Sequence, residues 1–213
     1  MYKKKLFGFI GAGGHGRESV FLLSQFNNEE YEVYFIDDEE HDNKIGNYKV
    51  LSIDNFLKIN NDEKYFNISI SDSYIREKLA EKMLTNNVKP LSLACSSSIK
   101  NTENKIGDGL LQSSYSLITT DIEIGKFFHL NSFSSIHHDC IIGDYVTFAT
   151  GVRCNGNVKI GDHVLIGSGA VIRNGKKNEP LEIGSGSVIG MGTIVTKNIP
   201  PNTKVYGNPA KII

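Results

Sequence analysis

Hydrophobic positions in the first part of the chain follow the spacing of alternating strands and helices. Apolar runs at 5–10, 31–38 and 65–71 predict strands, and the first of them ends directly at Gly11. Segments 17–26 and 73–87 have apolar residues at helical spacing, with Ser73 as the expected N-cap of the second helix. Because strands and helices alternate, we expect a parallel sheet with crossover helices, which is an α/β domain.

From about residue 98 the pattern changes to a strict period of six. Pairs of isoleucine and glycine begin at 106, 124, 142 and 160, so each step is 18 residues. Every sixth position from 106 to 172 is apolar except Gln112, and small or β-branched residues dominate four positions later. Neither a helix nor a hairpin sheet repeats every six residues. Three six-residue sides that close one triangular coil do, so the segment predicts a parallel β-helix of about five coils.

The hexad period also indicates where the domains begin and end. The polar segment 173–182 interrupts the repeat once and predicts a loop that leaves the coil at a corner. The last residues, from 200 onward, depart from the hexads and predict a terminal cap. We therefore expect a Rossmann-like α/β half-domain over 1–95 and a β-helix domain with its C-terminal cap over 96–213.

Composition narrows the partners and the compartment. The 213 residues include 23 Lys and Arg and 24 Asp and Glu, so the charge does not favour binding to nucleic acid or to an anionic membrane. No apolar run approaches the ~18 residues that cross a bilayer, and glycines interrupt the basic and apolar start, unlike a signal peptide. The three cysteines are scattered, which argues against a zinc or disulfide framework. We expect a cytoplasmic protein without a metal.

The first predicted strand leads into a glycine-rich turn. Gly11, Gly13 and Gly16 have the spacing G-x-G-x-x-G, and such a turn offers backbone N–H groups and a helix N-terminus to a phosphate. Asp37 follows Gly16 by 21 residues, at the place of a ribose-binding acid. The motif alone fits NAD, another nucleotide or a structural turn. About 95 residues, however, form only half of a dinucleotide fold, with room for one nucleotide.

Taken together, these motifs resemble a known family. The hexads and the ending "VYGNPAKII" are similar to the left-handed β-helix of the hexapeptide-repeat acyltransferases. With the start "GAGGHGR" and the stretch "NSFSSIHHDCIIGD", nearly the whole chain resembles the PglD-like sugar-nucleotide N-acetyltransferases. This resemblance implies acetyl transfer from acetyl-CoA to the 4-amino group of a UDP-linked 4-amino-4,6-dideoxy sugar in bacterial glycan synthesis. It also implies a homotrimer with active sites between subunits, and an N-terminal domain that binds the nucleotide sugar instead of NAD.

The resemblance also assigns binding residues. It places the sugar nucleotide's diphosphate at Gly13, Gly14 and His15 and its uridine at Asp37 and Asp38, with Ser71 standing where relatives usually carry glycine. It places acetyl-CoA around Thr147, Gly156, Ser168 and Met191, three of which (Thr147, Ser168 and Met191) differ from the residues of relatives. Basic residues of the interrupting loop, Arg173, Lys176 and Lys177, either meet the phosphates of CoA or are solvated.

Acetyl transfer to an amine needs a base, because the nitrogen must lose a proton before its lone pair can attack a thioester. Histidine suits this task near neutral pH. The resemblance selects His138 as that base, Asp139 as the acid that orients its ring, and Asn131 as a residue that helps to hold the sugar. Relatives tend to have glutamate where Asp139 stands. His137 and His138 are adjacent on an extended chain and point apart, so they are not expected to share a zinc ion.

The other histidines and the nearby cysteine have a simpler interpretation. His41, His129 and His163 lack neighbours in the sequence that would give them a chemical role, so we expect surface or structural roles. Cys140 occupies an inward hexad position, which indicates a core residue and not an acyl carrier.

Two other functions remain open from the sequence. One is an O-acetyltransferase of the sialic acid type, which uses the same scaffold on a hydroxyl. The other is a non-catalytic β-helix that binds a nucleotide sugar, against which the pair His138–Asp139 argues.

Overall fold

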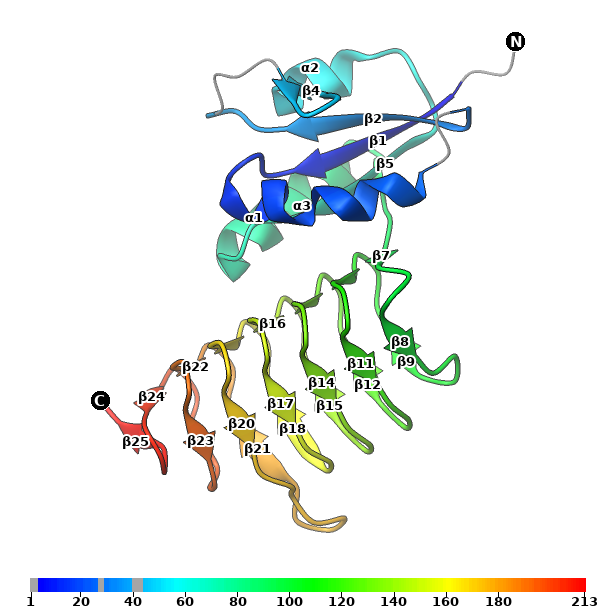
Figure 1. The fold of residues 1–213 in the computed structure, drawn as a ribbon. Coiled ribbons are helices and arrows are strands. Elements are labelled where there is room, and N and C mark those ends of the chain that lie inside the picture. The colour runs from blue at the N-terminus through cyan, green and yellow to red at the C-terminus, as the bar shows by residue number, and fades with distance from the viewer. Residues whose placement is uncertain (1–3, 27–28, 40–43) are drawn as a thin grey trace. The chain divides into compact units, whose positions relative to one another are not determined.

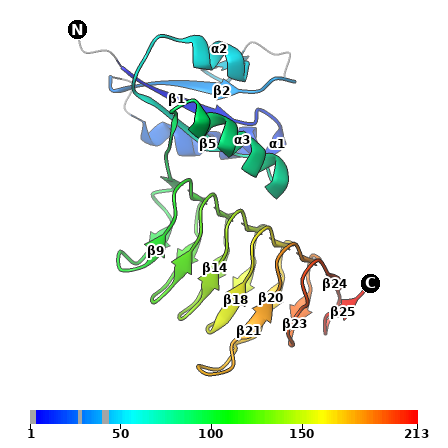
Figure 2. The ribbon, with the colours of Figure 1, turned by 180° about the vertical axis from the view of Figure 1, so that it is seen from behind.

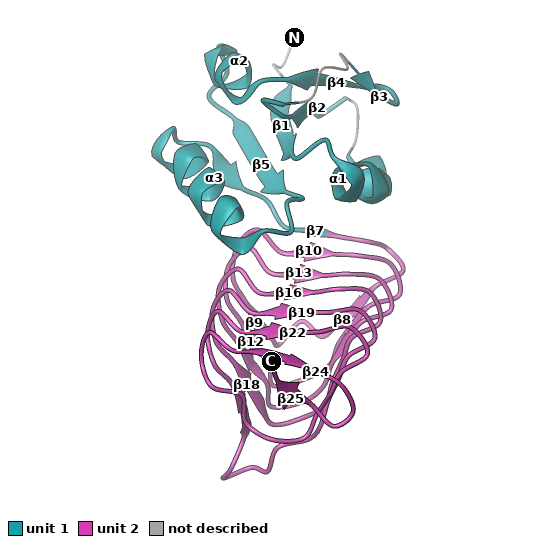
Figure 3. Cartoon of the chain, turned by 90° about the vertical axis from the view of Figure 1, so that its left-hand side faces the viewer, with its two compact units in different colours: residues 1–93 teal, residues 94–213 magenta. Residues whose placement is uncertain are grey.

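The computed structural model describes residues 4–26, 29–39 and 44–213. The chain divides into two compact units, 1–93 and 94–213, shown in two colours in Figure 3. The division expected from the sequence, between 95 and 96, lies two residues later. His41 lies outside the described residues.

Unit 1 is built on a six-stranded sheet in the order β3-β4-β2-β1-β5-β6 (Figure 1). All of its pairings are parallel except β3 with β4. The three predicted strands are present, whereas the hairpin β3–β4 and the short β6 were not expected. The strands are β1 (Lys5–Ile10), β2 (Tyr31–Ile36), β3 (Lys44–Ile45), β4 (Tyr48–Leu51), β5 (Lys64–Ile68) and β6 (Lys89–Pro90).

The helices of unit 1 differ from the expectation in two details. The predicted helix 17–26 begins earlier, as α1 (Gly14–Glu18), and continues as the 3₁₀ helix η1 (Ser19–Gln25). Helix α2 (Ile53–Lys58) was not predicted, and α3 (Ser73–Thr85) was. The prediction of Ser73 as the N-cap is wrong, because Ser73 is the first helical residue of α3. Asp72 is the N-cap instead, and its carboxylate accepts hydrogen bonds from the backbone amides of Tyr74 and Ile75.

Unit 2 is a left-handed parallel β-helix with three faces. The first face is an eight-stranded sheet of β7 (Leu93–Ala94), β10 (Leu111–Gln112), β13 (His129–Leu130), β16 (Thr147–Phe148), β19 (Leu165–Ile166), β22 (Val188–Ile189), β24 (Lys204–Tyr206) and β25 (Lys211–Ile212). The second face contains β8 (Ile99–Lys100), β11 (Leu117–Ile118), β14 (Ser135–Ile136), β17 (Arg153–Cys154), β20 (Val171–Ile172) and β23 (Ile194–Val195). The third face contains β9 (Lys105–Ile106), β12 (Glu123–Ile124), β15 (Ile141–Ile142), β18 (Val158–Ile160) and β21 (Leu181–Ile183).

Strand register confirms the predicted period. On the second face Leu117 pairs with Ser135, and Ser135 with Arg153, so successive coils lie 18 residues apart. Six strands form this face between Ile99 and Val195, one more than the five coils expected from the sequence.

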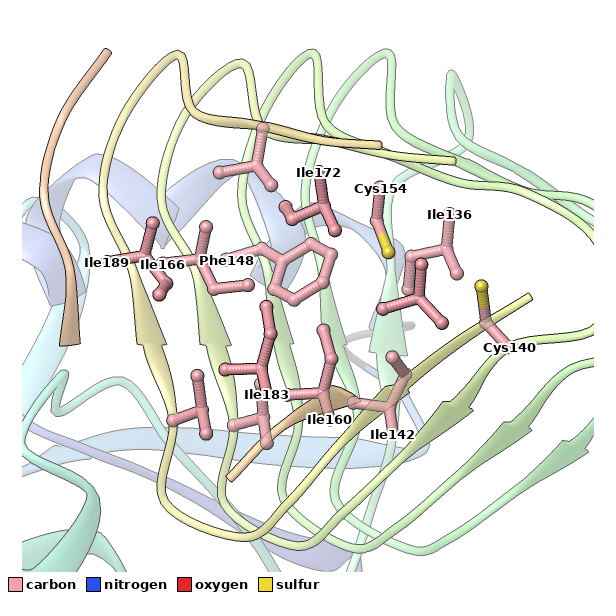
Figure 4. Packing of buried hydrophobic residues seen from close by; sticks show 14 of the residues in the cluster. Ile136, Cys140, Ile142, Phe148, Cys154, Ile160, Ile166, Ile172, Ile183 and Ile189 are labelled. Atoms are coloured by element: carbon pink, nitrogen blue, oxygen red, sulfur yellow. The ribbon is translucent and has the colours of Figure 1, made fainter. Parts of the chain in front are cut away.

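The inward positions of the hexads form one continuous core. Figure 4 shows Ile136, Ile142, Phe148, Cys154 and Ile160 pointing into the prism, and all are buried. Each such side chain contributes about 1.5–3 kcal/mol by leaving water, so the core stabilises the whole stack of coils. The exception, Gln112, is also buried, and its Nε2 donates a hydrogen bond to the carbonyl of Ile99.

Three corners join the faces, and each is marked by residues with positive φ. The first corner, between the first and second faces, carries Tyr115, Phe133, Gly151, Gly169 and Gly192 in successive coils. The second corner, between the second and third faces, carries Asp121, Asp139 and Asn157. Asn and Asp tolerate this conformation better than most residues, which explains their use at the second corner.

The segment that interrupts the hexads leaves the helix at the second corner, as the sequence predicts (Figure 2). The amide of Gly175 donates a hydrogen bond to the carbonyl of Gly156, which anchors the loop to the coil before it. A bridge and an ion pair between Lys176 and Glu179 close the loop. The antiparallel pair β24–β25 then ends the chain as a cap. Within the described residues we find no helix with the length and apolarity that a membrane span needs.

Candidate active site

The glycine turn after β1 is held from both sides. The hydroxyl of Ser69 donates to the carbonyls of Ile10 and Gly11, and the ring Nδ1 of His15 lies 2.9 Å from the carbonyl oxygen of Ser69. A Cβ at position 16 would overlap the carbonyl of Gly11, so the third glycine of the motif is required by packing. A Cβ at Gly13 or Gly14 would meet nothing within 4 Å. Those two glycines therefore leave open backbone that a ligand can approach closely.

The two aspartates after β2 are used in local structure. Asp37 accepts hydrogen bonds from the amides of Ala12 (2.8 Å) and Glu39 (2.9 Å), one at each carboxylate oxygen. Asp38 accepts one from the amide of Ile53 at the start of α2 (2.9 Å). Both line a cavity of about 350 Å³ together with Gly11, at the carboxyl ends of the strands. Of the predicted substrate residues, Gly13, Gly14, His15 and Ser71 do not line this cavity.

Two residues that shape this region were not singled out from the sequence. Ser69 holds the glycine turn, and buried Arg76 donates hydrogen bonds to the carbonyls of Ile70 and Ser71, which fixes the loop after β5. Arg76 lies on the buried side of α3 with Ala80 and Met83. Residues spaced by four and then three positions share the inward face of a helix. An arginine at such a position was therefore a sequence signal for a buried, hydrogen-bonded side chain.

The second corner of the β-helix holds the predicted base. His138 Nδ1 lies 2.7 Å from Asp139 Oδ2, and the two side chains are 50% and 55% exposed. A carboxylate can only accept a hydrogen bond, so this contact favours the proton on Nδ1 and leaves the lone pair on Nε2. The ring lies over Gly156, one coil further on: a Cβ there would be 2.5 Å from its Cε1 and Nε2 atoms.

Replacing Gly156 with alanine should displace the imidazole without harming the fold. The added methyl group would meet the movable end of the His138 side chain, and φ at this position lies outside the region that favours glycine. A base shifted by about 1 Å can lose about a hundredfold in rate. We expect kcat to fall by about that factor while the melting temperature stays near that of the wild type. Lys159→Ala, at an exposed residue of the following strand, is the control and should have wild-type kcat. Equal activity of the two variants would contradict the packing of His138 on Gly156.

The remaining predicted residues of unit 2 lie elsewhere. Asn131, Ser168 and Met191 lie at the first corner, where the amide of Gly192 donates to the carbonyl of Ser168 and stacks successive coils. Thr147 is buried in β16 on the first face. The structure thus brings His138, Asp139 and Gly156 together at one corner, and Ser168 and Met191 at another. Within one chain the second face separates these two groups.

His129, His163, Cys140 and Cys154 pack within the coils of unit 2. His129 is buried in β13, and the His163 ring stacks on Tyr145 with centroids 5.4 Å apart. Cys140 is buried, as predicted. The pKa of Cys154 is raised by its hydrogen bond to Cys140 and by burial. Across the described residues, no group of three or more His, Cys, Asp or Glu side chains could hold a metal ion.

Comparison with known proteins places this geometry in a family. Residues 8–83 match the model of the PglD N-terminal domain, and 157–197 match the hexapeptide repeat of succinyl-transferase. GDP-perosamine N-acetyltransferase of Escherichia coli O157:H7 is 44% identical over 97% of this chain and 95% of its own length.

Solved structures agree with that match. WeeI from Acinetobacter baumannii AYE has a TM-score of 0.93 at 41% identity and covers 99% of this chain and 100% of its own. The acetyltransferase domain of PglB from Neisseria gonorrhoeae FA1090, solved with acetyl coenzyme A, has a TM-score of 0.88 at 24% identity over 99% of this chain and 100% of its own, and supports the same fold. The chain belongs to the PglD-like sugar N-acetyltransferases and is an enzyme of the acetyltransferase class.

Proposed function

We propose that the enzyme transfers the acetyl group of acetyl-CoA to the 4-amino group of a nucleotide-linked 4-amino-4,6-dideoxy sugar, with His138 as general base. The observation that carries this proposal is the 2.7 Å contact between His138 and Asp139 at an exposed corner, with Nε2 over Gly156. The sequence leads us to expect a UDP sugar, whereas the name of the Escherichia coli relative points to a GDP sugar. We propose GDP and keep UDP as the alternative to be tested. The expected cytoplasmic location stays a prediction.

In the proposed reaction, His138 Nε2 accepts a proton from the sugar's amino group, and the nitrogen forms its new bond to the thioester carbonyl carbon. Acetyl-CoA supplies the activated acyl group, whose carbon–sulfur bond breaks. Protonated His138 then returns its proton to the departing sulfur, so that the products are the N-acetylated sugar and CoA. Asp139 keeps the ring oriented and stabilises its positive charge between the two transfers.

We propose that the site is completed by a second copy of the chain in a homotrimer. The separation of the two corner groups supports this, because residues assigned to acetyl-CoA lie at both corners of one prism. The second face, between those corners, also suits a contact between subunits. Four of its six outward positions are apolar (Ile99, Leu117, Val171 and Ile194) and two are polar (Ser135 and Arg153). On the third face four of the five are charged (Lys105, Glu123, Lys159 and Glu182), and Ile141 is the exception. The apolar positions of such a face are stabilised when another chain covers them.

A thiol-release assay with acetyl-CoA tests the proposed reaction. The acceptors are GDP-, UDP- and dTDP-linked 4-amino sugars, free sialic acid, and a GDP-linked 6-deoxy sugar with a hydroxyl at C4 as the matched control. We expect CoA release with the amino sugars, fastest with the GDP form, and none with the hydroxyl control or sialic acid. Release with sialic acid alone would favour the O-acetyltransferase. Binding of a nucleotide sugar without any turnover would favour the non-catalytic alternative.

A further inference from the structure

The cavity of unit 1 has the walls of a site for a flat ring. Its volume of about 350 Å³ is within the range of small-molecule pockets. Strand ends supply Ile10 and Ile36, α2 supplies Ile53, and α3 supplies Ile75 and Leu79. It opens at the carboxyl ends of parallel strands beside the glycine turn, which is where nucleotides bind in open α/β sheets.

The polar side chains in the lining all have the same character. They are the carboxylates of Asp37, Asp38 and Glu39, and the described lining contains no lysine, arginine or histidine. Both oxygens of Asp37 already hold backbone amides, as does Oδ1 of Asp38. Glu39 is exposed, and its carboxylate has no hydrogen-bond partner among the described residues. The cavity therefore offers a free carboxylate to a ligand, next to apolar walls.

A free carboxylate distinguishes the common bases by their edges. Guanine presents two adjacent donors, N1–H and the N2 amino group, which match the two oxygens of a carboxylate. Uracil and thymine place their N3–H between two carbonyl oxygens, so that the second carboxylate oxygen would face an acceptor. Adenine and cytosine set one amino donor beside a ring-nitrogen acceptor. Among the five bases, only guanine satisfies both oxygens without repulsion.

We propose that Glu39 selects guanine, by accepting hydrogen bonds from N1–H and from the N2 amino group of a base held between the isoleucines of this cavity. This rests on the proposed function only in taking the ligand to be a nucleotide sugar. Asp37 and Asp38 are positioning residues in this arrangement, because they fix the glycine turn and the start of α2 that form the walls.

Isothermal titration of the full chain with GDP, IDP and UDP, in the absence of acetyl-CoA, tests the proposal. GDP should bind most tightly, and IDP, which lacks the N2 amino group, about tenfold more weakly, as expected for one charge-assisted hydrogen bond. Glu39→Gln should weaken GDP by about tenfold or more and leave UDP unchanged, because the new amide donor faces the donors of guanine. Glu81→Gln, at an exposed residue of α3 outside the cavity, is the matched control and should bind all three ligands as the wild type does.

Two results would overturn the assignment. One is equal affinity, either of the wild type for GDP, IDP and UDP, or of the wild type and the Glu39→Gln variant for GDP. The other is loss of the preference for GDP in Asp38→Asn, which keeps an oxygen for the Ile53 amide, but not in Glu39→Gln. Both concern binding without acetyl-CoA, so they are independent of acetyl transfer. If the enzyme acetylates a UDP sugar faster than a GDP sugar, the proposed reaction stands and the selection of guanine by Glu39 is refuted. If the protein binds GDP selectively but has no turnover, the selection of guanine stands and the proposed reaction is refuted.

Discussion

Replacing His138 with asparagine should lower kcat for acetyl transfer by about a thousandfold, within the range expected for loss of a general base. Asparagine retains a polar amide at the corner but cannot take up the proton of an amine. Because His138 is half exposed, its replacement should leave the melting temperature and the assembly unchanged. The pH dependence of kcat/KM should also differ between the wild type and the variant, because the variant has no base at this corner.

The adjacent His137 provides the control for this experiment. Because neighbouring side chains on an extended chain point apart, we expect His137 to face away from the reacting atoms, so His137→Asn should keep wild-type kcat and the wild-type pH profile. If His138→Asn retained full activity with an unchanged pH profile, His138 would not be the base.

Much of the β-helix could be predicted because its core repeats locally. An inward residue every six positions and a coil every 18 are properties of the sequence itself, and the register and the buried isoleucines confirm them. The contact of His138 with Gly156 could be predicted from the same period, since the two residues are 18 positions apart and therefore neighbours in successive coils. Asn131 and His138 are seven positions apart, about one side of the triangle, which explains why these two residues lie at different corners.

Unit 1 was less predictable because its details depend on contacts distant in the chain. Asp72 and Ser73 are both good N-caps, and only the path of the chain after β5 decides between them. Ser69 and Arg76 donate hydrogen bonds to backbone carbonyls, and a motif of side chains in the sequence does not indicate such contacts. The short α2 and the hairpin β3–β4 contain too few residues to show a period.

A mixture of two inactive variants should regain activity if neighbouring chains share each site. Ser168→Trp should abolish turnover, because an indole at the exposed first corner fills the path assigned to acetyl-CoA. In mixed assemblies with His138→Asn, a site works when one chain supplies an intact second corner and its neighbour an intact first corner. With equal amounts and random assembly, about a quarter of the sites meet both conditions.

Mixing His138→Asn with Gly156→Ala is the matched control, since both changes lie at the second corner of the same chain. No site in that mixture has an intact second corner, so its activity should not exceed the average of the two variants measured alone.

The most direct measurement is therefore the kcat of co-assembled His138→Asn and Ser168→Trp subunits, compared with that control mixture. If the imidazole of His138 works in a site that another chain completes, the mixture of His138→Asn and Ser168→Trp should have about a quarter of wild-type activity. The mixture of His138→Asn and Gly156→Ala should show no gain. Absence of recovery in the first mixture, with co-assembly verified by differently tagged subunits, would contradict the shared site.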